Sequence, residues 1–180
     1  LLAVVYYYNA SMYMIDPTVA SISAGTAIAI GVGTLIGSWI IYDLLCKSTL
    51  VKQQKLFALL GFILVVALAF GLSQYLSARA AYIHVGALLG TIMAGNVFLG
   101  IMPSQRALVE AVQRGEAPDP SYGAFAKLRS THNNYFTLPL IFIMISNHYP
   151  VTYTHEYNWL VLSAIGLITA IARHFFNLRH

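Results

Sequence analysis

The residues best suited to chemistry lie in the segment 129–150, which reads RSTHNNYFTLPLIFIMISNHYP. The segment begins with a block of hydrogen-bonding side chains, is apolar over residues 136–145, and closes on a second polar block that contains Asn147 and His148. Unpaired amides and imidazoles are costly in or near lipid, so we expect these side chains to face protein, a ligand or trapped water. A helix that only crosses a membrane would not need them.

The first polar block offers a cation, several hydrogen-bond donors and acceptors, and an aromatic ring within two helical turns. Its members with these properties are Arg129, His132, Asn133, Asn134 and Tyr135. The set predicts a ligand site. Helix capping is the alternative, because Ser, Thr and Asn favour caps, although a cap needs one such residue rather than four. Asn133 and Asn134 are adjacent and thus about 100° apart around a helix, so both can reach one ligand only if the helix is unwound there.

The elements that position this segment are membrane helices, as the composition shows. Of the 180 residues, 58% are hydrophobic and 9% charged, with a mean hydropathy of +0.70. Soluble domains carry about 25% charged residues. The net charge of +4 therefore reports membrane topology and does not indicate nucleic acid as a partner. The only cysteine, Cys46, excludes an internal disulfide and a CxxC metal site, and no CxxCH motif attaches haem c within the chain.

We predict an all-α fold, a polytopic transmembrane helical bundle with five full spans plus the end of a sixth. The predicted spans cover residues 25–46, 56–76, 80–102, 131–149 and 159–176, and residues 1–8 form the end of the sixth helix. Residues 103–129 are predicted to form a cytoplasmic loop with a short amphipathic helix over 104–114. Two glycine steps, Gly33–Gly37 and Gly86–Gly90, predict close helix contacts. The whole chain, 1–180, is expected to be a single domain and a fragment of a longer chain.

The basic residues predict the orientation of this bundle. With alternating spans, all but Arg79 fall on one side, which the positive-inside rule places in the cytoplasm. His84 and His148 then lie toward the outer face. His84, near the start of a glycine-rich helix, is a candidate haem b or metal ligand, and the alternative is an interfacial histidine bonded to a carbonyl. Asn96 is predicted to make an interhelical hydrogen bond.

Four stretches of the chain resemble a known family. They are residues 129–150 quoted above, IHVGALLGTIMAGNVF at 83–98, GEAPDP at 115–120 and RHFFNLRH at 173–180. Together they resemble the bacterial membrane-bound urate oxidase family over nearly the whole chain. The resemblance implies a multi-pass protein of the bacterial inner (cytoplasmic) membrane that oxidises urate to 5-hydroxyisourate. Its electrons pass to a cytochrome c, fused or separate, and not directly to O2. The family's first helices and its cytochrome domain are absent from this sequence.

If the ligand is urate, we assign the polar residues three roles. The predicted catalytic residues are His132, Asn133 and Asn134, the substrate contacts are Arg129, Tyr135 and Asn147, and the cofactor ligands are His84 and His148, with His84 as the metal ligand. A planar purine anion needs paired donors and acceptors, a cation and an aromatic ring, which the first block provides. Haem b is the candidate cofactor of the membrane domain, and haem c is expected only on a domain or partner outside this chain.

Two other functions are compatible with these residues. One is a haem b or quinone-linked electron-transfer subunit, and the other is a non-catalytic accessory subunit of a respiratory membrane complex. The partners expected on these readings are a cytochrome c, other membrane helices or respiratory subunits, and the lipid bilayer.

Overall fold

The structure is a computed structural model that describes residues 2–179, with side chains from residue 4 onward, so Leu1 and His180 lie outside it. Every regular element in this part of the chain is helical, as predicted. The elements are α1 (Leu2–Tyr8), α2 (Ala10–Tyr13), α3 (Ala24–Lys47), the 3-10 turn η1 (Thr49–Lys52), α4 (Gln54–Ser73), α5 (Ala78–Gly95), the π-helical turn η2 (Asn96–Ile101), α6 (Met102–Gln113), α7 (Pro120–Ser146), α8 (Pro150–Tyr153) and α9 (Asn158–Leu178).

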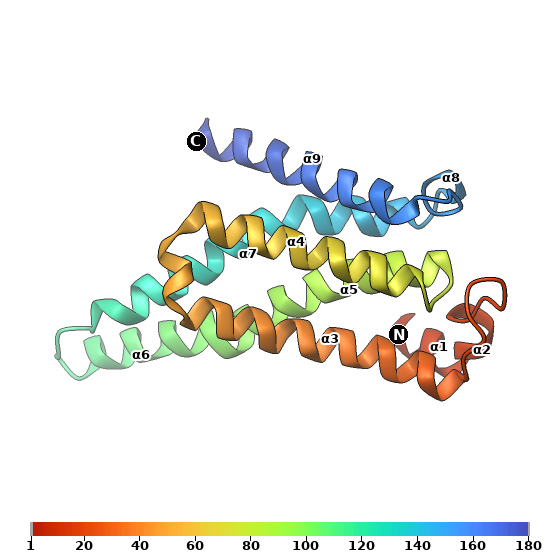
Figure 1. Cartoon of the computed structure of the whole chain (residues 1–180). Coiled ribbons are helices and arrows are strands. Elements are labelled where there is room, and N and C mark those ends of the chain that lie inside the picture. The colour runs from red at the N-terminus through yellow and green to blue at the C-terminus, as the bar shows by residue number, and fades with distance from the viewer. Residues whose placement is uncertain (1, 180) are drawn as a thin grey trace.

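The long helices form an elongated bundle in which α3, α4, α5, α7 and α9 run along one axis (Figure 1). At one end, α6 and the first part of α7 extend beyond the other helices. At the opposite end lie α1, α2, α8 and the loops beside them. α7 packs against both α5 and α9, so the polar block of residues 129–135 has neighbours on two sides.

α5 is the central helix of the bundle. It contributes nine buried residues, whereas α3 contributes five and α4 only Ala69 and Leu72. The alanines and glycines of α5 allow other helices to approach its backbone, as small residues do in membrane bundles. Leu56, Leu59, Ile63, Leu64 and Phe70 of α4 are exposed, which suits contact with lipid.

Four helices are long and apolar enough to cross a membrane: Ala24–Lys47, Gln54–Ser73, Ala78–Gln113 and Asn158–Leu178. They correspond to four of the five predicted spans, although α4 ends at Ser73, three residues before the predicted end of the span 56–76. The fifth, 131–149, belongs to α7, which is not among these four because its polar block offsets its apolar run. α7 continues through Pro139 as one helix and ends at Ser146, three residues before the predicted end.

Within the predicted loop 103–129, the amphipathic helix expected over 104–114 corresponds to α6, whereas residues 120–129, expected to be loop, are helical in α7. Helical structure runs without a break from Ala78 to Gln113 and resumes at Pro120, so the two helices form a hairpin and only the GEAPDP segment turns. The π-helical turn η2 precedes Pro103, where α6 begins and a missing backbone N–H costs little. Gly115 adopts a φ of 72° in the turn, and Asp119 caps α7 by accepting the Ser121 N–H at 2.8 Å. That bond lowers the pKa of the Asp119 carboxyl.

The predicted glycine contacts are correct for only one of the two steps. Gly86 packs so tightly against Met144 of α7 that a Cβ there would overlap its sulfur, and Gly90 is in ordinary contact with Leu140. Gly33 and Gly37 have no neighbour within 4 Å of a built Cβ among the described residues. α3 makes its close approaches elsewhere, because Gly31 lies against His84 and Tyr7.

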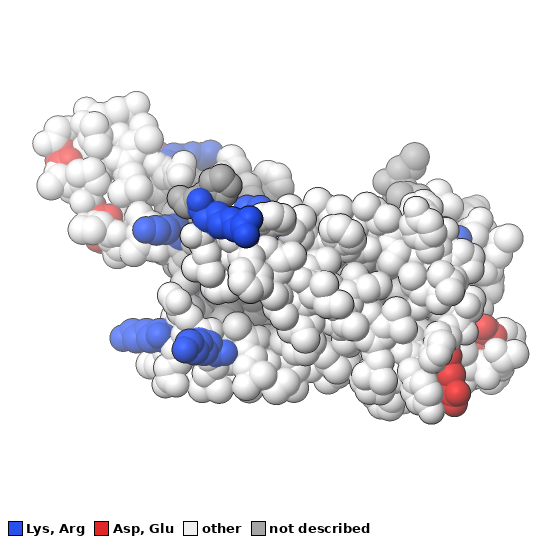
Figure 2. Space-filling view, turned by 90° about the horizontal axis from the view of Figure 1, so that it is seen from above, with Lys and Arg blue, Asp and Glu red and all other residues white. Residues whose placement is uncertain are grey.

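The charged residues are distributed unevenly along the bundle. Figure 2 shows most of the lysine and arginine side chains toward the end at which α6 extends, with acidic side chains at its outermost tip, while the opposite end shows mainly acidic side chains. This uneven distribution of basic residues is the feature from which the sequence predicts the orientation of the bundle in the membrane.

Candidate functional site

α7 places a buried arginine inside the bundle. Arg129 is 2% exposed, and its Nη2 donates to Asp43 Oδ1 of α3 at 2.6 Å. The other carboxylate oxygen of Asp43 lies 2.6 Å from the Lys47 ammonium one helical turn later. The guanidinium also lies over the rings of Tyr42 and Phe125, at 5.2 and 4.9 Å from their centroids. A charge held this far inside an apolar bundle marks a functional-site candidate.

Asn96, at the start of η2, connects Arg129 to the neighbouring helices. It is 1% exposed, and its Oδ1 accepts the Arg129 Nη1 donor at 2.9 Å. Its Nδ2 donates to the Tyr42 hydroxyl at 2.9 Å and to Asn133 Oδ1 at 2.8 Å. The predicted interhelical hydrogen bond of Asn96 is thereby confirmed, and the residue joins α3, α5–η2 and α7.

The hydrogen bonds around Tyr42 have a defined direction. Because the Tyr42 oxygen accepts from Asn96, its one proton is free to be donated to His132 Nδ1, 2.8 Å away. The neutral tautomer of His132 that accepts this hydrogen bond carries its own hydrogen on Nε2. The imidazole stacks on Phe57 of α4, with centroids 5.0 Å apart, and Cys46 lies 3.8 Å from Nδ1. His132 thus ends a chain of hydrogen bonds that begins at the Asp43 carboxylate.

We call this connected set the Arg129 network. Its members are Asp43, Arg129, Asn96, Tyr42, His132 and Asn133. Both polar atoms of the Asn133 side chain are hydrogen-bonded, since Oδ1 accepts from Asn96 and Nδ2 donates to the Met93 carbonyl at 3.0 Å. The network is a fixed polar layer across α3, α5 and α7.

Asn134 and Tyr135, predicted to share a ligand with Asn133, face a different helix. Asn134 Oδ1 accepts from Arg173 Nε at 2.8 Å and from Asn177 Nδ2 at 2.9 Å, both on α9. The Tyr135 hydroxyl lies 2.9 Å from His174 Nδ1 and its ring stacks on that imidazole. The helix remains wound, so the angle between adjacent residues separates Asn133 from Asn134. The first polar block therefore forms two sites.

A cleft opens beside Arg129, between α3, η2 and α7. Its volume is about 260 Å³, and its lining consists of Trp39, Asp43, Lys47, Gly95, Asn96, Leu99, Gly100, Phe125 and Arg129. Trp39 packs on Gly95, where a Cβ would overlap the indole nitrogen. The Trp39 Nε1 and Arg129 Nε atoms are both buried without a hydrogen-bond acceptor among the described residues. Two donors without acceptors are thus present in side chains that line one cleft.

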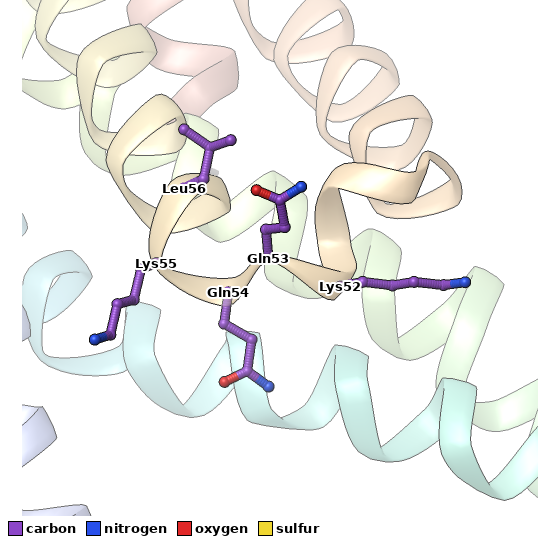
Figure 3. A pocket seen from close by; sticks show the side chains of 5 residues that line it. All are labelled: Lys52, Gln53, Gln54, Lys55 and Leu56. Carbon is purple, nitrogen blue, oxygen red and sulfur yellow. The ribbon is translucent and has the colours of Figure 1, made fainter.

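The larger hollow, about 460 Å³, lies away from the network and is a poor candidate. Its lining is five consecutive residues, Lys52 to Leu56, at the start of α4. Figure 3 shows the Lys52 and Lys55 side chains pointing away from each other, so they do not converge on one ligand. It is a surface depression of the basic end.

The predicted haem ligand His84 is 2% exposed and already bonded at both ring nitrogens. Its Nδ1 donates to the Ala80 carbonyl at 2.8 Å, and its Nε2 accepts from the Tyr7 hydroxyl at 2.9 Å. His148 is exposed at the end of α7. Haem iron requires a free imidazole nitrogen, so His84 as packed does not fit this group, because both of its ring nitrogens are hydrogen-bonded. Over residues 2–179, moreover, no three His, Cys, Asp or Glu side chains are grouped to hold a metal.

Asn147, a predicted substrate contact, lies at the opposite end of α7 from the Arg129 network. It is 4% exposed, its Nδ2 donates to the Ile143 carbonyl of its own helix, and its Oδ1 has no partner among the described residues. The structure thus brings together Arg129, His132 and Asn133 and leaves Asn134, Tyr135, Asn147 and the two histidines elsewhere.

Sequence reasoning missed three residues of this site: Trp39, Tyr42 and Asp43. All three lie on α3, within a span that was interpreted only through its glycines. The sequence did contain a signal for Asp43, because an acidic residue inside a predicted membrane span is rare and is a functional candidate by default.

A model of the family described as "Urate oxidase N-terminal" matches residues 1–180. Comparison with curated proteins and with solved structures gave no match.

Proposed function

Because this chain belongs to the urate oxidase N-terminal family, we propose that it oxidises urate to 5-hydroxyisourate at a membrane and passes the electrons to a cytochrome c. Urate and one water molecule give 5-hydroxyisourate, two electrons and two protons. Each electron reduces one ferric haem c, carried by a domain or partner outside this chain. We infer that the protein lies in a bacterial cytoplasmic membrane, with its lysine- and arginine-rich end inside.

The observation that best supports a urate site is the buried guanidinium of Arg129. Urate is a monoanion at neutral pH, and its charge must be compensated when the molecule leaves water. Arg129 is fixed by Asp43 and Asn96 while its Nε donor lacks an acceptor among the described residues. Because the Arg129 side chain is already fixed before binding, little conformational entropy is lost when an anion binds to it, which favours affinity.

The other members of the Arg129 network act as positioning residues in this proposal. His132 Nδ1 accepts a hydrogen bond from the Tyr42 hydroxyl, and the Tyr42 oxygen in turn accepts one from Asn96 Nδ2. Asn133 fixes the second N–H of Asn96, and the Asn96 Oδ1 is then directed at Arg129. Asn134 has no contact with this chain of bonds, because both its partners lie on α9.

The two adjacent asparagines provide the experiment. In the complete polypeptide that contains this chain, Asn133→Ala and Asn134→Ala are compared for urate turnover with cytochrome c, normalised to folded protein. Loss of the Asn133 acceptor leaves a buried N–H of Asn96 unpaired, which typically costs ~1–3 kcal/mol. We therefore expect kcat/KM to fall roughly tenfold or more in Asn133→Ala. Asn134→Ala should retain the wild-type value per folded molecule.

Equal losses in the two variants would show that the Arg129 network has no special part in turnover. Absence of urate-dependent cytochrome c reduction by the unmodified polypeptide would remove the proposed function altogether. Arg129→Lys serves as a further variant, because it keeps the charge and loses the two-ended contact with Asp43 and Asn96.

A further inference from the structure

We propose that the cleft beside Arg129 is where a planar purine anion binds, and that Trp39 is a residue that determines its specificity. This inference rests on the proposed function and adds the location of the urate-binding site. Four observations on the cleft support it: its charge, its π-helical wall, its donors without acceptors, and its shape.

The charge of the cleft fits a monoanion. Its lining has three charged residues, Asp43, Lys47 and Arg129, so two cations face one anion and the net charge is +1. Both cations already contact the same carboxylate, at 2.6 Å each. One positive charge is therefore left without a counter-charge in the lining, and a singly charged ligand would neutralise it.

One wall of the cleft is the π-helical turn η2. Three lining residues, Asn96, Leu99 and Gly100, belong to this turn of six residues. A π-helical turn is rare and is found frequently at functional sites, because its wider hydrogen-bond spacing is less favourable than an α-helix. Here it separates α5 from α6 and directs Asn96 toward Arg129. The π-helical turn and the buried cation thus occur at the same place.

The cleft also has hydrogen-bonding capacity that the protein does not use. Trp39 Nε1 and Arg129 Nε are buried donors with no acceptor among the described residues. Leaving such a donor unpaired is energetically costly, so native proteins rarely keep two together without a reason. The carbonyl oxygens of an oxidised purine are acceptors on the rim of a flat ring, and they would satisfy donors of this kind.

The shape of the cleft suits a flat bicyclic molecule. Its volume of about 260 Å³ is just under the range of about 300–1,000 Å³ that is typical of sites for drug-sized ligands. Trp39 and Phe125 contribute aromatic surfaces from α3 and α7, and Gly95 and Gly100 keep the helical wall thin. Aromatic rings stack on planar heterocycles and exclude water from them.

The test is equilibrium binding of urate to the complete polypeptide under anaerobic conditions, without cytochrome c, so that no turnover occurs. Trp39→Phe keeps an aromatic ring and removes the indole N–H. The matched control is Trp159→Phe, because Trp159 packs edge-to-face on Phe70 of α4 and does not line the cleft. We expect the Kd for urate to rise about tenfold in Trp39→Phe and to stay within twofold of wild type in Trp159→Phe.

A second variant keeps the proposal testable if Trp39→Phe fails to fold. Phe125→Leu removes an aromatic surface on the other side of the cleft and should weaken urate binding several-fold. Wild-type affinity in whichever of these variants folds would overturn the cleft as the binding site, while continued urate turnover would leave the proposed function intact. If the unmodified polypeptide neither binds nor oxidises urate, the proposed function fails together with this inference.

Discussion

Replacement of Asn96 by alanine is the most informative single change to the fold. Asn96 is 1% exposed and makes three interhelical side-chain hydrogen bonds, to Arg129, Tyr42 and Asn133. Interhelical bonds in membrane proteins average about 0.6 kcal/mol and hydrogen bonds in general about 1–1.5 kcal/mol. Three such bonds come to about 2–4 kcal/mol, and one of them has a charged donor. We therefore expect Asn96→Ala to lower the free energy of unfolding by about 3 kcal/mol.

The chain offers a matched control for this variant. Asn147 is also an asparagine buried to a similar degree, yet its only side-chain hydrogen bond is to its own helix and its Oδ1 is unpaired. Its removal relieves an unsatisfied group while it breaks one weak bond, so Asn147→Ala should change stability by less than about 1 kcal/mol.

The measurement is reversible unfolding of the purified protein in mixed micelles, with increasing SDS and tryptophan fluorescence as the readout. Both variants are compared with wild type at the same lipid and detergent ratio. If the two variants unfold at the same SDS fraction, the Arg129 network does not hold the bundle together. The direction of hydrogen bonds described for Tyr42 and His132 would then also lose its structural support.

Three further predictions concern other parts of the bundle. Gly86→Ala should destabilise the bundle by ~1–3 kcal/mol, because the new methyl group meets Met144. Gly37→Ala meets open space and should be neutral or slightly stabilising. Equal effects of the two variants in thermal unfolding would contradict this packing. Haem b bound at His84 would require Tyr7 to release Nε2, so loss of a haem absorbance in His84→Ala, with the protein still folded, is the result that would establish haem there. For topology, His155→Cys should react with an impermeant maleimide in intact cells and Glu116→Cys only after permeabilisation, and the reverse pattern would invert the orientation.

Composition determined the fold class, and the placement of the apolar runs along the sequence determined most helix positions. A chain with 9% charged residues cannot cover a soluble surface, and its long apolar runs must be helical because lipid offers no partner for backbone groups. The predicted spans 25–46 and 159–176 therefore match α3 and α9 closely. The span 80–102 and the loop after it were less predictable. Helical periodicity does not show whether a helix continues through a proline such as Pro103 or stops before it. The π-helical turn η2, which precedes Pro103, depends on tertiary contacts.

The candidate site shows the same division. The sequence identified the polar block of α7, because a run of amides and imidazoles beside an apolar stretch is conspicuous in a membrane protein. The rotation of α7 decided which of these side chains belong together. Asn133 meets Asn96 and Asn134 meets Arg173, although the two asparagines are neighbours in the chain.

Only the tertiary structure decided which residues complete the site from other helices. Asp43, Tyr42 and Trp39 lie about 90 residues before Arg129 and His132 in sequence, and nothing in their spacing along α3 relates them to α7. A buried cation needs a counter-charge, so Arg129 requires some acidic partner, but the chain has six acidic residues. Which of them pairs with it follows from the packing of α3 against α5 and α7, since side chains on separate helices meet only when the bundle closes.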